Sequence, residues 1–248
     1  MRRRTARVGP LLSILSAILL TACANAPAAQ TPATVPQPQH AQPDNRIVFP
    51  ASASQGGLVF GKVPAGSTAR YGDRVLRATP YGTVVFGIGR DETGPVQVAV
   101  TRADGSIETS TIAITPRDWP IERIDGVPPA TVNPPPDIAA RIEREQAMVV
   151  AARVRDDDRA DFAQSFIWPV QGRVSGRFGN QRVYNGTPKS PHSGMDIAAG
   201  EATPVMAPAA GIITFADPGL YLTGGTVLLD HGHGVSSNFL HLARIDVK

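Results

Sequence analysis

Alternating apolar and polar positions dominate the chain between residues 47 and 115. Val96, Val98 and Val100 alternate with small or polar residues, which is the two-residue period of a strand with one buried face. Asp104-Gly105 then predicts a tight hairpin turn. Shorter strands are predicted over three apolar stretches: Leu58-Val59-Phe60, Val75-Leu76 and Val84-Val85-Phe86. About seven strands in all predict a small β-sandwich, with an immunoglobulin-like one as a candidate, and we interpret it as a spacer or protein-contact module.

A helical period replaces the alternation after the proline-rich segment 120–136. Ile138, Ile142, Val149 and Ala152 recur at spacings that keep them near one helix face, and Asp137 is predicted to cap the first turn. The charged run 155–159 is interpreted as the solvated end of this helix. The helix is therefore predicted to be a connector.

A second strand-rich region begins near residue 166 and is punctuated by glycines. Strands are predicted over residues 205–208 and 211–215. Residues 226–230 and 235–242 are predicted to form an antiparallel pair across a turn at 231–234. The fold class is thus mainly β: an N-terminal small β-sandwich, a connector helix, then a partial antiparallel-β domain.

The N-terminus is typical of an exported bacterial lipoprotein. Four arginines precede an apolar stretch, residues 11–20, that is too short to span a membrane comfortably. Leu20-Thr21-Ala22-Cys23 then has the pattern of a lipobox, which predicts lipidation of Cys23. The alternative is an ordinary secretory signal cut near Ala26. Cys23 is the single cysteine of the chain, which excludes an internal disulfide.

Processing would also change the charge of the protein. The full sequence has 24 Lys and Arg against 21 Asp and Glu, a net charge of +3. Removal of residues 1–22 takes away four arginines and no acid, which leaves 20 against 21, or −1. The mature chain therefore has no basic character that would indicate a nucleic-acid partner. Residues 24–45 are rich in Pro, Ala, Gln and Thr and are predicted to be a flexible tether, in which His40 is solvated.

Candidate chemistry is concentrated between residues 191 and 242, which contain four of the five histidines. His192 and Asp196 are four positions apart, and imidazole with carboxylate is a ligand pair that suits Zn²⁺. His241 lies in a predicted strand and is expected to share a face with Phe239. A histidine in that place can exchange a proton or stabilise a developing oxyanion.

These residues belong to an ordered series of motifs. The series starts with Trp168-Pro169, Gly172, Gly176-Arg177-Phe178-Gly179 and Arg182, followed by the H-x-G-x-D of His192 to Asp196. It continues with Pro204-Val205, Ala207-Pro208-Ala209-Ala210-Gly211, Asp230-His231-Gly232, Gly234 and Phe239-Leu240-His241-Leu242. In this order the motifs resemble the lysostaphin/LytM-type zinc metallopeptidases, which cut peptide bonds of bacterial peptidoglycan. The resemblance covers roughly residues 165 to 248.

The resemblance implies zinc as cofactor, His192 and Asp196 as zinc ligands, and His241 as a catalytic histidine. It places His231 in a turn, and Arg182 is either a substrate-binding or an ordinary surface residue. The family's last motif, which supplies the third ligand, does not occur in the sequence. We therefore expect the LytM-like domain to be C-terminally truncated, and so incomplete at its C-terminus. His231 or His233 as a substitute ligand is an alternative, although Gly232 and Gly234 predict a mobile turn.

Two functions follow from the resemblance as expectations. The first is a zinc metalloendopeptidase that cuts peptidoglycan and is held to the membrane by a lipid anchor, in the cell envelope facing the periplasm or wall. The second is a catalytically inactive wall-associated lipoprotein that binds or activates another wall hydrolase. The predicted organisation is a lipoprotein signal peptide (1–22), a lipidated cysteine and tether (23–45), a β-sandwich (46–118), a proline-rich linker with connector helix (119–163) and a LytM-like metallopeptidase domain (164–248).

Overall fold

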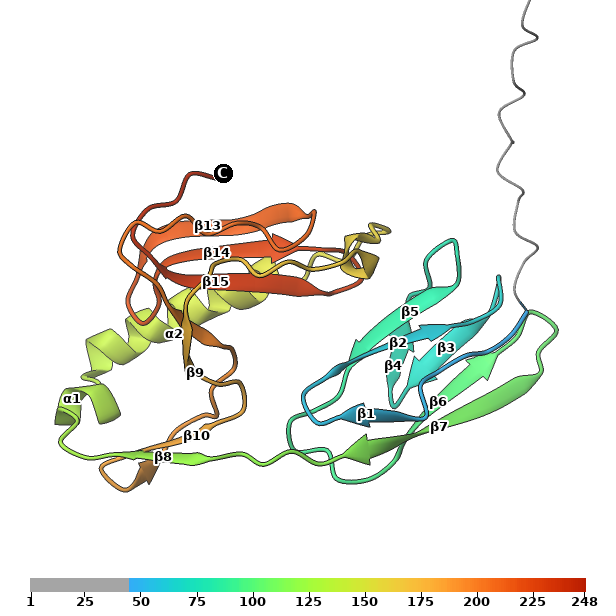
Figure 1. Cartoon of the computed structure of the whole chain (residues 1–248), viewed down its shortest axis with the longest axis horizontal. Coiled ribbons are helices and arrows are strands. Elements are labelled where there is room, and N and C mark those ends of the chain that lie inside the picture. Colours follow the sequence, from blue (N-terminus) through green and yellow to red (C-terminus); the bar gives the residue numbers. More distant parts are fainter. Residues whose placement is uncertain (1–44) are drawn as a thin grey trace, which may run out of the picture. The chain divides into compact units, whose positions relative to one another are not determined.

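The structure, a computed structural model, describes residues 45–248 and is mainly β, which confirms the predicted fold class (Figure 1). Cys23, His40 and the predicted signal and tether lie outside the described residues. None of the helices in the described part has the length and apolarity needed to cross a membrane.

The first strands form a sandwich of two sheets around an apolar core. Its strands are β1 (Ser52–Ser54), β2 (Leu58–Lys62), β3 (Thr68–Tyr71), β4 (Arg74–Leu76), β5 (Thr83–Gly87), β6 (Val96–Thr101) and β7 (Ile107–Thr115). One sheet has the order β1-β7-β6-β3-β4 and the other pairs β2 with β5. Val98, Val100 and Ile112 are fully buried between them, as the alternation predicts.

The segment after the sandwich contains a strand that the sequence pattern did not predict. β8 (Ile121–Ile124) runs parallel to β10 (Gln181–Tyr184), and Glu122 lies directly opposite Arg182 in the register. Residues that are paired across two strands project from the same face of the sheet. The proline-rich segment therefore supplies a strand to the C-terminal module.

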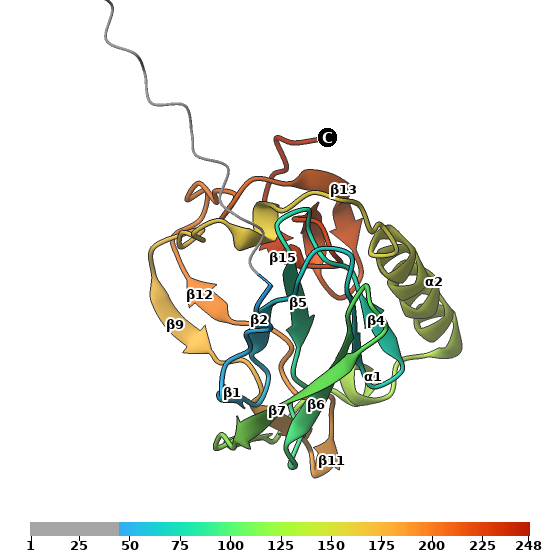
Figure 2. The ribbon, with the colours of Figure 1, turned by 90° about the vertical axis from the view of Figure 1, so that its right-hand side faces the viewer.

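Two helices follow, α1 (Pro129–Val132) and α2 (Pro136–Ala152). The predicted cap at Asp137 is wrong: the N-cap is Pro135, and Asp137 lies within the first turn. Pro136 begins the helix because its missing N–H is a donor that the first turn leaves unpaired anyway. α2 lies against the next sheet (Figures 1 and 2), where Arg141 Nη2 donates to Gly219 O at 3.0 Å.

The C-terminal module contains a short 3₁₀ helix and small sheets, whose strands pair antiparallel except for β10 with β8. Its elements are η1 (Asp161–Ala163), β9 (Arg173–Gly176), β10, β11 (Thr187–Pro188), β12 (Asp196–Ala198), β13 (Ile212–Leu220), β14 (Gly224–Asp230) and β15 (Ser236–Leu242). β9 pairs with β12 (Figure 2), and β14 lies between β13 and β15. Residues 205–208, predicted as a strand, have no regular structure, whereas the predicted pair β14–β15 forms.

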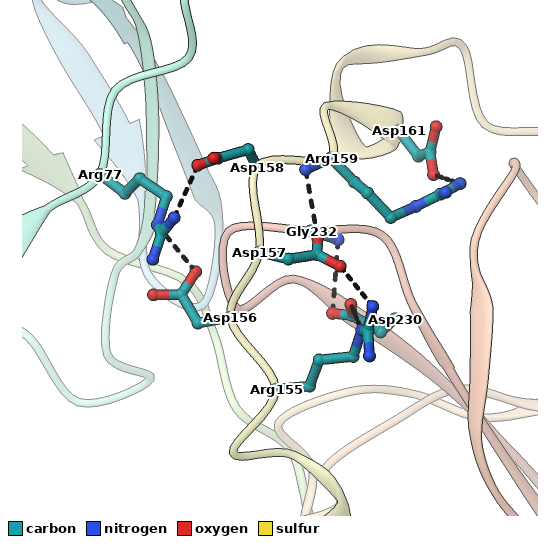
Figure 3. Close-up of polar contacts among 9 residues, drawn as sticks. All are labelled: Arg77, Arg155, Asp156, Asp157, Asp158, Arg159, Asp161, Asp230 and Gly232. Atoms are coloured by element: carbon teal, nitrogen blue, oxygen red, sulfur yellow. Dashed lines mark hydrogen bonds and ion pairs between the residues drawn. The ribbon is translucent and has the colours of Figure 1, made fainter.

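The charged run 155–159 is an ion-pair network rather than a solvated helix end (Figure 3). α2 ends at Ala152, and the chain then places Asp156 and Asp158 around Arg77 of the sandwich, at 3.2 and 2.6 Å. Arg155 contacts Asp157 at 2.6 Å and Asp230, at the end of β14, at 3.4 Å. The prediction failed because the partners of these charges are distant in sequence.

Asp230 is the buried member of this network. The residue is only 4% exposed, and its carboxylate accepts the backbone N–H of Gly232 at 3.3 Å. Burial raises the pKa of Asp230 above its ordinary value, because removing the ionised carboxylate from water is unfavourable. The carboxylate therefore opposes folding at neutral pH, except as far as Arg155 offsets its charge.

The sandwich core predicts a large difference between two isoleucines of β7. Ile112→Ala should lower the free energy of unfolding by about 2–5 kcal/mol, since Ile112 is fully buried. Ile107→Ala makes the same change at a side chain that is 69% exposed and should stay within about 0.5 kcal/mol of wild type. Urea unfolding of both variants measures this, and equal losses would contradict the core assignment.

Asp230 predicts a specific pH dependence. A raised pKa in the folded state means that the stabilising contribution is present below about pH 4 and is lost as the pH rises through the folded-state pKa. Lowering the pH from 7 to about 4 should therefore stabilise wild type relative to Asp230→Asn, as urea midpoints measure. Asp118→Asn removes an exposed carboxylate and is the control. If the urea midpoint of wild type does not rise relative to that of Asp230→Asn on acidification, the proposed role of Asp230 is refuted.

Candidate metal-binding site

The side chains of His192, in the loop before β12, and Asp196, the first residue of β12, lie next to each other. His192 Nε2 and Asp196 Oδ1 are 3.1 Å apart. Gly176, opposite Asp196 in the β9–β12 pair, leaves the room for this carboxylate, because a Cβ there would lie 2.2 Å from Asp196 Oδ2. The glycine of the Gly176-Arg177-Phe178-Gly179 motif is thus explained by the close approach of Asp196.

The hydrogen bond of His192 Nδ1 determines whether Nε2 carries a proton or a free lone pair. His192 Nδ1 lies 3.1 Å from the carbonyl oxygen of Arg177, which can only accept a hydrogen bond. Nδ1 therefore donates, and in a neutral ring Nε2 carries the lone pair that faces the carboxylate of Asp196. Two acceptors at 3.1 Å need a proton or a metal cation between them. A ligand histidine that donates its second N–H to a backbone carbonyl is the usual arrangement at metals.

The backbone of His192 is held by two hydrogen bonds. Its N–H donates to Asn180 O and its carbonyl accepts from Gly179 N–H, both at 2.8 Å. Gly179 has a φ of +87°, which favours glycine, and an added Cβ would overlap the ring of Trp119. The loop therefore fixes the backbone position from which the His192 side chain extends.

Arg182 contacts the same site from β10. Its Nη2 lies 3.2 Å from Asp196 Oδ2, and its Nε lies 3.4 Å from Glu122 Oε2. Glu122 also accepts a hydrogen bond from Asn180 Nδ2 at 2.5 Å. The hydrogen bond from Asn180 and the contact with Arg182 lower the pKa of Glu122, so that it is an anion here. Glu122 was not singled out from the sequence, because nothing near residue 122 forms a motif.

The donor set fits two ligand positions of a zinc ion. Zinc binds imidazole nitrogen and carboxylate oxygen at about 2.0–2.2 Å, so donor atoms about 3 Å apart can share one ion. Catalytic zinc sites have three protein ligands. Within residues 45–248 no group of three His, Cys, Asp or Glu side chains gathers to hold a metal. The ligand roles of His192 and Asp196 therefore stay predictions.

His241 lies in a bulge of β15 rather than in a regular strand. Val227 pairs with Phe239 and Gly225 with Leu242, so β15 carries one extra residue over this interval. His241 has a φ of +59° and is exposed, while its N–H donates to Thr223 O at 2.8 Å. His241 therefore does not follow the strand alternation that would place it on the face of Phe239, because the bulge interrupts that alternation. Its catalytic role remains a prediction.

The turn between β14 and β15 is ordered by its histidines. His231 is fully buried, its Nδ1 lies 2.6 Å from Ala210 O, and its Nε2 lies 2.8 Å from Ser237 Oγ. The ring of His233 contacts the ring of Phe162, with centroids 4.9 Å apart. The turn, expected to be mobile, thus has hydrogen bonds and packing contacts on both of its histidines. Both ring nitrogens of His231 already have protein partners, so the geometry does not favour it as a substitute ligand.

Comparisons with known proteins agree with this fold and site. Residues 190–248 match the model of Peptidase family M23. The cell division protein DipM of Caulobacter vibrioides is 29% identical over 117 residues, which are 47% of this chain and 18% of DipM. A crystal structure described as a peptidase M23 from Pseudomonas aeruginosa has 28% identity and a TM-score of 0.58, over 79% of this chain and 76% of that one.

The fold and the ordered motifs thus define the class as a LytM-type module. Residues 190–248 match the family M23 model and the chain is similar to DipM and to an M23 crystal structure, which confirms the resemblance predicted from the motifs. The chain spans less than a fifth of the length of DipM, so the activity and partners of that whole protein are not transferred.

The different surroundings of the histidines predict different effects on stability. His231→Ala should lower the free energy of unfolding by about 2–4 kcal/mol, because it leaves a cavity and two unpaired polar groups. His241→Asn should change it by less than about 0.5 kcal/mol, since the site is exposed and Asn tolerates a positive φ. Thermal unfolding of the two variants would overturn this assignment if His241→Asn were the less stable.

Proposed function

We propose that this chain is a peptidoglycan-directed zinc metalloendopeptidase that hydrolyses peptide bonds in the stem peptides or cross-links of the cell wall. The observation that carries the proposal is the pairing of His192 Nε2 with Asp196 Oδ1 at 3.1 Å, inside a module of family M23. Family M23 in turn suggests a peptidase that acts on peptidoglycan.

His192 and Asp196 are the residues that would hold the ion. A bound zinc ion supplies a Lewis acid and lowers the pKa of a water ligand. The Arg177 carbonyl orients His192 for this role by keeping the proton on Nδ1, which leaves Nε2 as the ligand atom. Arg182 holds the second carboxylate oxygen of Asp196, so that Oδ1 remains for the ion.

His241 and Arg182 are the candidates for work on the substrate. His241 is proposed to hold or move a proton during attack on the peptide carbonyl, for which an exposed imidazole is suited. Arg182 has a side chain that is 30% exposed, so part of its guanidinium can still reach a substrate oxygen. Its main contacts are nevertheless the two carboxylates.

The proposal includes a place in the cell envelope. The lipobox at Cys23 supports a lipid anchor, which would hold the protein at the membrane while it faces the periplasm or wall. Peptidoglycan is then within reach as the substrate. Residues 24–45, which are rich in Pro, Ala, Gln and Thr, are proposed to be a flexible tether, and such a tether suits a protein that acts on an extended polymer.

A second candidate is a catalytically inactive wall-associated lipoprotein that binds or activates another wall hydrolase. The contact of Arg182 with Asp196 Oδ2 at 3.2 Å favours it, because a guanidinium already compensates the carboxylate without a metal. In that case the site would have a structural role. The two candidates differ in whether His192 and Asp196 are needed for activity.

Zinc binding and wall cleavage by the full chain test the first candidate. Wild type should bind one zinc per chain and release soluble peptide fragments from purified peptidoglycan, and His192→Ala should abolish both, since it removes a ligand. Ser193→Ala changes the exposed residue beside the ligand and should retain both. Elemental analysis measures the zinc, and chromatography of the released fragments measures cleavage.

The same preparations decide between the candidates. A wild-type chain that neither binds zinc nor cuts peptidoglycan contradicts the endopeptidase. If that chain stimulates a purified wall amidase, and His192→Ala and Asp196→Ala stimulate it equally, the second candidate holds. Cleavage that is lost only in the ligand variants excludes it.

A further inference from the structure

Glu122 is the one acidic side chain of β8 and lies outside every motif of the family series. Its side chain is 34% exposed, and both its carboxylate oxygens contact the C-terminal module. Oε1 accepts from Asn180 Nδ2 at 2.5 Å, and Oε2 lies 3.4 Å from Arg182 Nε. The strand that carries it comes from the segment after the sandwich, about 60 residues before its partners.

One contact of Glu122 leads to the predicted ligand Asp196. The guanidinium of Arg182 lies between two carboxylates, with Nε toward Glu122 and Nη2 toward Asp196 Oδ2. The fork of an arginine has a fixed planar geometry, so fixing one edge fixes the direction of the other. Glu122 thereby determines where Arg182 holds the carboxylate of Asp196.

The other contact leads to the predicted ligand His192. Asn180 is only 7% exposed, and its carbonyl accepts the backbone N–H of His192 at 2.8 Å. The Asn180 side chain is fixed by Glu122, so the residue that carries the backbone acceptor of His192 is held from the same carboxylate. The two contacts therefore reach both members of the ligand pair.

We propose that Glu122 is a positioning residue for the metal-binding pair, through Arg182 to Asp196 and through Asn180 to His192. The proposal rests on the proposed function in that His192 and Asp196 are taken as the metal ligands. It means that the segment joining the sandwich to the C-terminal module contributes part of the metal site. Residues that orient metal ligands change metal affinity by about 10–100-fold when replaced.

Zinc titration of the full chain tests the proposal. Glu122→Gln keeps the shape of the side chain but removes its charge, so Arg182 should lose its second carboxylate and turn toward Asp196. We expect zinc affinity to fall about tenfold, as competition with a chromogenic chelator measures. Glu108→Gln is the control, because Glu108 of β7 pairs at 2.9 Å with Arg102, just after β6, and neither residue contacts His192 or Asp196.

A double-mutant cycle separates positioning from a general effect of charge. If Glu122 acts through Arg182, Glu122→Gln should cost much less in an Arg182→Gln background than in wild type. An equal loss in both backgrounds, or an equal loss in Glu108→Gln, would overturn the proposal. Unchanged zinc affinity in Glu122→Gln would overturn it as well.

A readout without metal keeps the test separate from the proposed function. In the zinc-free chain, the amide of His192 should exchange its hydrogen severalfold faster in Glu122→Gln than in wild type or Glu108→Gln, because its acceptor residue is released. If the wild-type chain does not bind zinc when zinc is added, the proposed function is refuted. The exchange rates of the zinc-free proteins still test whether Glu122 positions His192. Equal exchange in all three proteins refutes the positioning.

Discussion

The pairing of β8 with β10 is the constraint on which the candidate site depends. It brings Glu122 opposite Arg182, in a register in which both side chains lie on one face. Arg182 then reaches Asp196, and Asn180, at the entrance of β10, holds the backbone of His192. A short strand from the linker thus gives His192 and Asp196, the candidate metal-binding pair, a support that the C-terminal module does not contain by itself.

Burial and charge explain the order of the remaining module. α2 lies against the end of β13, while the charged run 155–159 connects Arg77 of the sandwich to Asp230 of β14. Surface ion pairs of this kind contribute little one at a time, and a network that includes a buried carboxylate contributes in a pH-dependent way. The fully buried His231 then joins the β14–β15 turn to Ala210 and Ser237.

Local patterns predicted what depends on local sequence. The alternation of Val96, Val98 and Val100 predicted β6, and the spacing of His192 and Asp196 predicted a pair that the structure brings to 3.1 Å. β8 could not be predicted, because Ile-Glu-Arg-Ile shows no clear period in four residues and its partner strand lies about 60 residues later. The bulge at His241 escaped prediction for a related reason: it arises from the register with β14.

Anomalous diffraction at the zinc edge, from crystals of the full chain grown with zinc, tests the metal-binding pair most directly. The account predicts an anomalous peak about 2.0–2.2 Å from both His192 Nε2 and a carboxylate oxygen of Asp196, with Arg182 still in contact with Glu122. An anomalous map without a peak at this pair, or with zinc held elsewhere by other residues, would contradict it.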